Sequence, residues 1–170
     1  VRETTEARLS CARDHHVTIA ACESLTAGLF MATLAAVPGA SDVLRGGFVT
    51  YTNEMKERLA HVDPAILEQY GAVSEPCARA MAANTRVLTG ADYAVSFTGN
   101  AGPSGSEGKP AGLVYCAVAS GTGCRIYRYD FDHASRNDIR TGVVRDMTER
   151  LLRIMKEELN GEKTGNCQER

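Results

Sequence analysis

The 170-residue sequence contains no tryptophan, and only 6% of its residues are aromatic. It also lacks any apolar stretch of about 18 residues, the length that a membrane-spanning helix needs, and it has no charged leader followed by an apolar segment. Its 19 basic residues are scattered among 21 acidic ones without forming a run. We therefore expect a soluble protein with no membrane partner and no nucleic-acid partner.

Cysteine and histidine are present in patterns that disfavour disulfide frameworks and metal sites. The six cysteines include no CxxC pair, and most of them lie in apolar segments where a thiol acts as a small hydrophobe. This usage predicts a reducing, cytoplasmic location. The sequence shows no metal-ligand spacing between a cysteine or carboxylate pair and any of its four histidines, His15, His16, His61 and His133. We accordingly predict no metal site and no cofactor.

The periodicity of apolar residues predicts alternating helices and strands. Strands are predicted at residues 17–21, 47–51, 93–98, 112–119 and 124–131. Helices are predicted at residues 4–13, 25–34, 74–90 and 135–160, and a short helix is predicted to begin at Pro64. Five strands interspersed with helices predict an α/β fold, specifically a three-layer α/β/α sandwich. The short turn at Gly121–Gly123 implies antiparallel pairing of the last strand, so the sheet should be mixed and mostly parallel.

No repeat or low-complexity linker interrupts the pattern. We therefore predict a single domain over residues 1–160. Residues 161–170 form a polar tail that we expect to be disordered.

Ser24 lies where an apolar strand gives way to a helical pattern that begins at Leu25. A hydroxyl at such a junction can be a nucleophile, because the free N–H groups of the new helix can hold a developing negative charge. Spacing alone also fits a serine that caps the helix.

The segment 46–56 supplies Tyr51 and Lys56, and a serine with a lysine is a known hydrolase pairing. Taken alone, Lys56, with glutamates at positions 54 and 57, is more typical of a solvated helix lysine. Tyr51 alone fits a core position.

Two further segments indicate ligand contacts. The glycine-rich segment 98–105 has the spacing G-x-x-G-x-x-G and precedes a strand, so it does not match a dinucleotide-binding loop. Its small residues still let backbone amides approach a ligand. Arg136 and Arg140 lie one turn apart at the start of the last helix, where guanidinium and amide groups can bind a phosphate together. A solvated arginine pair is the alternative.

Five motifs occur in an order and spacing that resemble the CinA C-terminal family. They lie at residues 21–28, 46–56, 71–76, 98–103 and 109–112. The resemblance runs from about Thr18 to Leu152. The characterised activity of the family is nicotinamide-nucleotide amidohydrolase. Longer members carry a separate N-terminal domain for which this chain has no room, so we expect the stand-alone form.

The resemblance implies roles for individual residues. Ser24 corresponds to the family's nucleophile, Lys56 to the general base and Tyr51 to a group that relays the proton or fixes the lysine. A general base must be neutral, which requires a lowered lysine pKa. Substrate contacts are implied for Thr26, Ala27, Gly28, Thr98, Gly99, Asn100, Ala101, Gly102, Arg136 and Arg140.

The implied reaction is hydrolysis of nicotinamide mononucleotide to nicotinic acid mononucleotide and ammonia, a step in pyridine nucleotide salvage. Leu25, Ala27 and Asn100 depart from the family's usual Cys, Gly and Ile. These departures leave two alternatives open. One is a non-catalytic module that binds a nucleotide or a protein partner, and the other is an amidase for another small amide. We expect a homo-oligomer, with a dimer as the first hypothesis.

Overall fold

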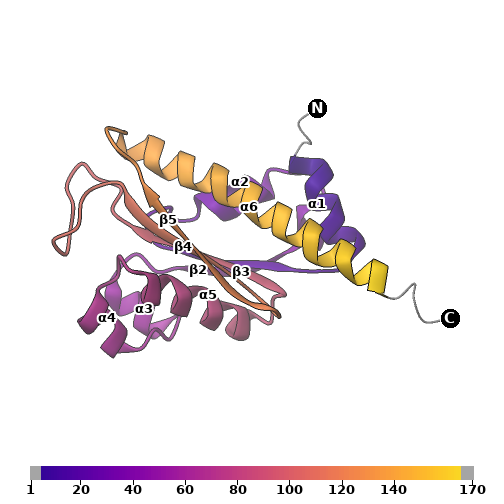
Figure 1. Cartoon of the computed structure of the whole chain (residues 1–170), viewed down its shortest axis with the longest axis horizontal. Helices are drawn as coiled ribbons and strands as arrows, with labels where there is room; N and C mark the ends of the chain where they lie inside the picture. The colour runs from indigo at the N-terminus through magenta and orange to yellow at the C-terminus, as the bar shows by residue number, and fades with distance from the viewer. Residues whose placement is uncertain (1–4, 166–170) are drawn as a thin grey trace.

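A five-stranded sheet separates two layers of helices (Figure 1). The computed structural model describes residues 5–165. The strands are β1 (Ile19–Glu23), β2 (Leu44–Val49), β3 (Tyr93–Gly99), β4 (Leu113–Ser120) and β5 (Gly123–Asp130). The helices are α1 (Thr5–Asp14), α2 (Leu29–Ala35), the 3₁₀ turn η1 (Ala40–Asp42), α3 (Asn53–Arg58), α4 (Pro64–Tyr70), α5 (Glu75–Thr89) and α6 (Arg136–Gly165). Helices α1, α2 and α6 cover one face and α3, α4 and α5 the other, which confirms the α/β/α sandwich.

The strand order is β2-β1-β3-β4-β5, with β1 parallel to both of its neighbours. The β3–β4 and β4–β5 pairs are antiparallel. The mixed sheet is therefore confirmed, but parallel pairing accounts for half of the pairs instead of most of them. The reason is the connection from β3 to β4, which contains no crossover helix and so returns the chain in the opposite direction.

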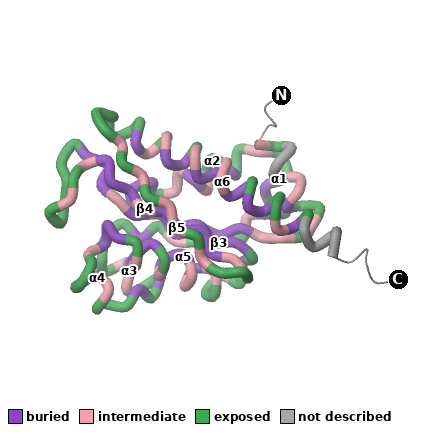
Figure 2. Tube along the Cα trace, viewed as in Figure 1, coloured by how far each residue is buried: buried purple, intermediate pink, exposed green. Residues whose placement is uncertain are grey.

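Buried side chains follow the strands and the inner sides of the helices (Figure 2). The largest apolar cluster lies between the sheet and the layer of α1, α2 and α6, and a smaller one packs under α4 and α5. The predicted apolar face of α6 is confirmed, because Ile139, Val143, Met147, Leu151 and Ile154 are all buried. A fold with two covered sheet faces of this kind gains most of its stability from apolar burial.

Helix α2 begins at Leu29, four residues later than predicted. Ala27 and Gly28 have φ angles of +46° and +96°, a left-handed conformation that interrupts a right-handed helix. Residues 24–28 therefore form turns. At the other end of the chain, α6 continues past Asn160 to Gly165, since glutamate and lysine there favour helix. The remainder of the expected tail, residues 166–170, lies outside the described residues.

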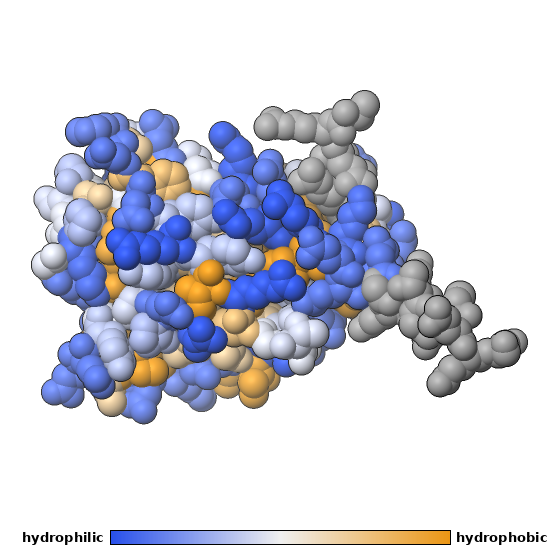
Figure 3. All heavy atoms as spheres, viewed as in Figure 1, coloured by the Kyte–Doolittle hydropathy of each residue, from blue (hydrophilic) through white to orange (hydrophobic). Residues whose placement is uncertain are grey.

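Over residues 5–165, none of the helices is both long and apolar enough to cross a membrane. The face shown in Figure 3 is largely hydrophilic, with apolar side chains exposed in separate small patches.

The carboxyl ends of the three parallel strands meet at one edge of the sheet. Ser24 follows β1 directly, Thr50 follows β2, and Asn100 follows β3. The Thr50 N–H donates to the carbonyl of Glu23 at 2.8 Å, which extends the β1–β2 pairing to the residue beside Ser24. In open α/β sheets ligands bind at this edge, so the fold places Ser24 where a site is expected.

Gly47 allows β2 to lie close to β1. A Cβ atom at Gly47 would stand 2.0 Å from the carbonyl oxygen of Ala21, whereas one at Gly46 would meet nothing within 4 Å. Both glycines have positive φ angles, 143° at Gly46 and 158° at Gly47.

We therefore predict that Gly47→Ala lowers the free energy of unfolding by about 1–3 kcal/mol more than Gly46→Ala. Only the Gly47 substitution would force the backbone of β2 away from that of β1. Urea denaturation of both variants measures the difference. Equal losses would mean that conformational strain, and not the close approach of the strands, sets the need for glycine.

Candidate active site

Ser24 and Lys56 are 32 residues apart in sequence, yet Ser24 Oγ and Lys56 Nζ lie 3.0 Å from each other. Ser24 directly follows β1, and Lys56 lies on α3 in the adjoining helical layer. Thr52 begins α3 by accepting the N–H of Met55, which turns the chain immediately after β2 and directs Lys56 back towards the strand ends. Lys56 is only 2% exposed, so the solvated-lysine alternative is wrong.

Three oxygen acceptors surround Lys56 Nζ, the Ser24 hydroxyl at 3.0 Å and two backbone carbonyls, and they fit the three N–H groups of an ammonium as well as a neutral amine. The carbonyl oxygen of Thr50 lies 2.9 Å away and that of Tyr51 3.5 Å away, and both accept hydrogen bonds from Nζ. A neutral amine has two N–H donors and one lone pair. With both carbonyls occupied by the two donors, the lone pair is available to accept the proton of the Ser24 hydroxyl.

Burial lowers the pKa of Lys56 from its usual value of 10.5. Within the described residues Lys56 has no salt bridge to a carboxylate. The neighbouring thiols of Cys77 and Cys22 and the Glu107 carboxylate oppose the shift in pKa, the thiols only as thiolates. Burial raises the pKa of both thiols, that of Cys77 to about 12, so they remain neutral. Desolvation therefore dominates and favours the free amine.

A cavity of about 190 Å³ opens beside Ser24. It is lined by Ser24, Leu25, Tyr51, Gly99, Asn100, Ala101, Gly102, Ser104 and Arg136. Most of the residues predicted in the glycine-rich segment are therefore brought together with the serine. Sequence reasoning named Leu25 only as a departure from the family motif and did not name Ser104, although Ser104 belongs to the glycine-rich segment that it identified.

Tyr51 lies at the rim of this cavity and is 55% exposed, so it is not a core residue. Its phenol oxygen accepts a hydrogen bond of 2.9 Å from Arg136. Only its backbone carbonyl faces Lys56 Nζ. The structure thus brings Tyr51 into the site but pairs its phenol with the arginine and not with the lysine.

Asn100 and Thr98 hold the cavity wall in place. The Asn100 amide nitrogen donates to the carbonyls of Lys109 and Pro110 at 3.3 Å, and its oxygen accepts from the Ser106 hydroxyl at 2.6 Å. These contacts close the loop between β3 and β4. The Thr98 hydroxyl is buried and donates to a backbone carbonyl at 2.7 Å, so it is not among the residues that line the cavity.

The sequence predicts that free N–H groups at the start of the helix after Ser24, which is α2, hold an oxyanion, and this prediction needs correction. The Glu23 carboxylate, 1% exposed, accepts the N–H groups of Phe30 at 2.9 Å and Met31 at 3.2 Å. The start of α2 is therefore already occupied by an anion from the chain itself. In the turn before it, the N–H groups of Leu25 and Thr26 have no hydrogen-bond acceptor among residues 5–165.

Thr26, Ala27 and Gly28 form that turn and are not among the residues lining the cavity. The two arginines also separate. Arg136 lines the cavity and donates to the carbonyl of Gly102 at 2.6 Å, whereas Arg140 donates to backbone carbonyls of the turn.

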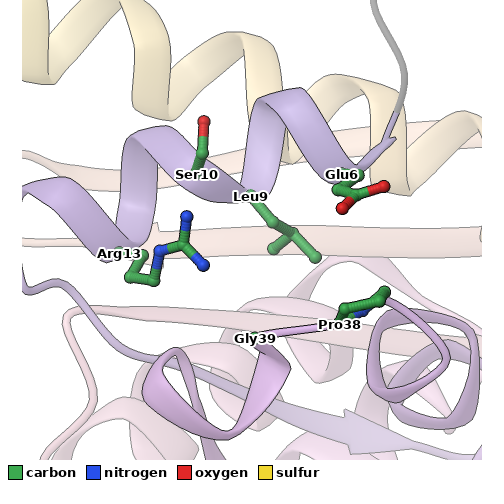
Figure 4. Close-up of a pocket in the computed structure, with 6 residues that line it drawn as sticks. All are labelled: Glu6, Leu9, Ser10, Arg13, Pro38 and Gly39. Carbon is green, nitrogen blue, oxygen red and sulfur yellow. The ribbon is translucent and has the colours of Figure 1, made fainter.

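A second cavity, of about 240 Å³, lies between α1 and the start of η1 (Figure 4). Glu6, Leu9, Ser10, Arg13, Pro38 and Gly39 line it. Its serine has no lysine or histidine among the lining residues. Within residues 5–165 there is also no group of three or more His, Cys, Asp or Glu side chains that could hold a metal ion. We therefore assign the candidate active site to the cavity beside Ser24.

The chain is thus an α/β/α protein with a buried serine–lysine pair at the carboxyl ends of its parallel strands. The family model of the CinA C-terminal domain matches residues 2–155, and the chain belongs to this family.

Proteins named competence-damage inducible are similar in sequence. One from Bacillus pumilus is 40% identical over 157 residues, which cover 92% of this chain and 36% of that protein. One from Geobacillus sp. is 55% identical over 103 residues, covering 61% of this chain and 25% of that protein. The chain thus spans about a quarter to a third of the length of these relatives.

Crystal structures of the superfamily share the fold. A CinA superfamily protein from Enterobacter cloacae has a TM-score of 0.85 and 28% identity, covering 91% of this chain and 95% of that one. A competence/damage inducible protein from Agrobacterium tumefaciens has a TM-score of 0.83 and 33% identity, covering 87% and 91%.

Because the folded-state pKa of Lys56 is lowered, the unfolded chain binds more protons, and this residue makes stability rise with pH up to about 10.5. We predict that Lys56→Met unfolds at an equal or higher urea concentration than the wild type at pH 6, and that its advantage narrows as pH rises. Denaturation at several pH values tests this. A loss of about 3–5 kcal/mol, as for a broken buried ion pair, would contradict it.

Proposed function

We propose that the chain is an amidase that hydrolyses the carboxamide of nicotinamide mononucleotide, giving nicotinic acid mononucleotide and ammonia. The observation that carries the proposal is the 3.0 Å contact between Ser24 Oγ and the buried amine of Lys56. The similarity to the CinA C-terminal domain supports the substrate, and the geometry supports the chemistry.

In the acylation step, neutral Lys56 takes the proton of Ser24 as Oγ attacks the amide carbon. The carbonyl oxygen becomes an oxyanion, for which the free N–H group of Leu25, a residue that lines the cavity, is the candidate donor. The lysine ammonium then gives its proton to the leaving nitrogen. The C–N bond breaks, ammonia leaves and an ester to Ser24 remains.

In the deacylation step, water attacks the ester carbon and passes a proton to Lys56. The bond from carbon to Ser24 Oγ breaks, and the lysine returns its proton to the serine. The products are the carboxylic acid and the enzyme in its starting state. Both half-reactions use one base, which must be neutral at the beginning of each.

The size and edges of the cavity fit a pyridine nucleotide held by its ring end. A volume of about 190 Å³ is smaller than the roughly 300 Å³ or more of typical ligand sites. It would admit the carboxamide ring, while the ribose and phosphate extend through the mouth. Arg136 is exposed there and uses only part of its five N–H donors on Gly102 and Tyr51, which leaves others for a phosphate.

An ammonia-release assay tests the proposal directly. Nicotinamide mononucleotide, its riboside, nicotinamide and simple aliphatic amides should be compared. The mononucleotide should have the highest kcat/KM. No release from any amide would favour the binding-module alternative, and preference for an unrelated amide would replace the substrate but keep the chemistry.

We predict that Ser24→Ala and Lys56→Arg both retain less than about a hundredth of wild-type kcat, because one removes the nucleophile and the other cannot be deprotonated. Wild-type kcat/KM should rise with pH through an ionisation below 10.5, since burial lowers the pKa of Lys56. Substantial activity in Lys56→Arg would show that the lysine supplies only positive charge. Circular dichroism of both variants confirms that they are folded.

We also predict that Arg136→Ala raises KM for the mononucleotide by about 10- to 150-fold and leaves KM for the riboside within about threefold, because the lost contact is to the phosphate. Arg145→Ala is the matched control, since Arg145 is exposed on the same helix and does not line the cavity. Equal effects on both substrates would refute the phosphate contact.

A further inference from the structure

Arg140 is held against the turn that follows Ser24. Its Nε donates to the carbonyl of Leu25 at 2.9 Å, and its Nη2 donates to the carbonyl of Thr26 at 3.3 Å. The remaining nitrogen, Nη1, donates to the Asn137 side chain at 3.3 Å. All three nitrogens of the guanidinium are therefore engaged within the chain, across 115 residues of sequence in the case of Leu25.

These contacts begin two chains of peptide groups. The first consists of one peptide unit, and the second of two units joined by a hydrogen bond. In the first, the carbonyl of Leu25 belongs to the same peptide unit as the N–H of Thr26. In the second, the carbonyl of Thr26 shares its unit with the N–H of Ala27, which donates to the carbonyl of Ser24 at 3.1 Å. The Ser24 carbonyl in turn shares its unit with the N–H of Leu25.

Each chain ends at an N–H group that has no acceptor among the described residues, that of Thr26 in the first and that of Leu25 in the second. A donor to a peptide carbonyl polarises the N–H of the same unit, and successive hydrogen bonds strengthen one another. A positive charge at the start of both chains therefore makes the terminal amides better donors and fixes their orientation.

The start of α2 cannot take over this task, because Glu23 already occupies the N–H groups of Phe30 and Met31. Two charged side chains thus fix the conformation of the turn at residues 24–28. The carboxylate of Glu23 fixes the helix that follows the turn, and the guanidinium of Arg140 fixes the carbonyls within it.

We propose that Arg140 is a positioning residue that orients and polarises the Leu25 amide, which borders the cavity, as the oxyanion donor, and that it does not bind the substrate phosphate. The inference rests on the proposed function, since it concerns the oxyanion formed when Ser24 attacks a carbonyl. It assigns Arg136 and Arg140, one turn apart on α6, to different tasks.

The test uses Arg140→Met, which removes the charge but keeps much of the stem, and Arg140→Lys, which keeps the charge but loses the fork. With both the mononucleotide and the riboside, Arg140→Met should lower kcat about 10- to 100-fold and leave KM within about threefold. Direct loss of one oxyanion donor costs about 10²- to 10³-fold, and an indirect effect should be smaller. Arg140→Lys should be intermediate, and the midpoint of the pH profile should not move, because Lys56 is untouched.

Pyridine-3-carboxaldehyde provides a second readout that requires no turnover and carries no phosphate. Its carbonyl carbon forms a bond with Ser24 Oγ, the serine proton passes to Lys56, and the former carbonyl oxygen becomes an oxyanion in the adduct. Affinity measured by titration should be lost in Ser24→Ala. It should weaken in Arg140→Met by a factor similar to that for kcat, while Arg145→Met, on the same helix and away from the cavity, should bind the aldehyde as the wild type does.

Three results would overturn the inference. They are an unchanged kcat in Arg140→Met, a loss confined to KM for the mononucleotide, and a wild type that forms no Ser24-dependent aldehyde adduct. If the wild type hydrolyses no amide but the adduct forms and weakens in Arg140→Met, the substrate proposal fails while the role of Arg140 stands. If Arg140→Met does not fold, kcat and aldehyde affinity in Arg140→Lys decide in the same way.

Discussion

Among residues 5–165, Lys56 Nζ is buried without a salt bridge to a carboxylate and contacts Ser24 Oγ, and the rest of the site depends on this contact. A buried amine without a counterion lowers its cost by giving up its proton. Two backbone carbonyls satisfy the N–H groups that remain. The arrangement contributes little to stability compared with an apolar side chain of the same length. In the proposed mechanism, the burial that costs stability at this position also lowers the pKa of Lys56, as a general base requires.

Around this pair, the turns that carry backbone amides are fixed by charged side chains. Glu107 accepts the N–H groups of Ala72 and Val73 at 2.8 and 3.1 Å, and Lys109 donates to the carbonyl of Tyr70 at 2.8 Å. These contacts tie the loop between β3 and β4 to the turn before α5. Arg136 also joins Gly102 of this loop to Tyr51 after β2, so two segments that line the cavity are held to each other. A preformed wall reduces the cost of ordering the site when a ligand binds.

Several departures from the family's usual residues acquire physical meaning in the structure. Ala27 has a φ of +46°, a conformation in which glycine is free and alanine is strained. Asn100 directs its amide into the loop, where it meets three carbonyls and the Ser106 hydroxyl. Neither change removes the serine or the lysine. They alter the support of the site and leave the reacting groups in place.

The sequence by itself determined the α/β/α class, the five strands, the apolar face of α6 and the positions of the motifs, because these follow from local periodicity and turn residues. It could not locate the start of α2, since left-handed residues at Ala27 and Gly28 override a helical pattern. Only the tertiary structure decided that Lys56 is buried against Ser24, that Glu23 fills the start of α2, and that Arg136 and Arg140 face different groups. Burial and contacts between distant segments depend on how strands and helices pack. A lysine or arginine in a sequence carries no local sign of whether water or another part of the chain will surround it.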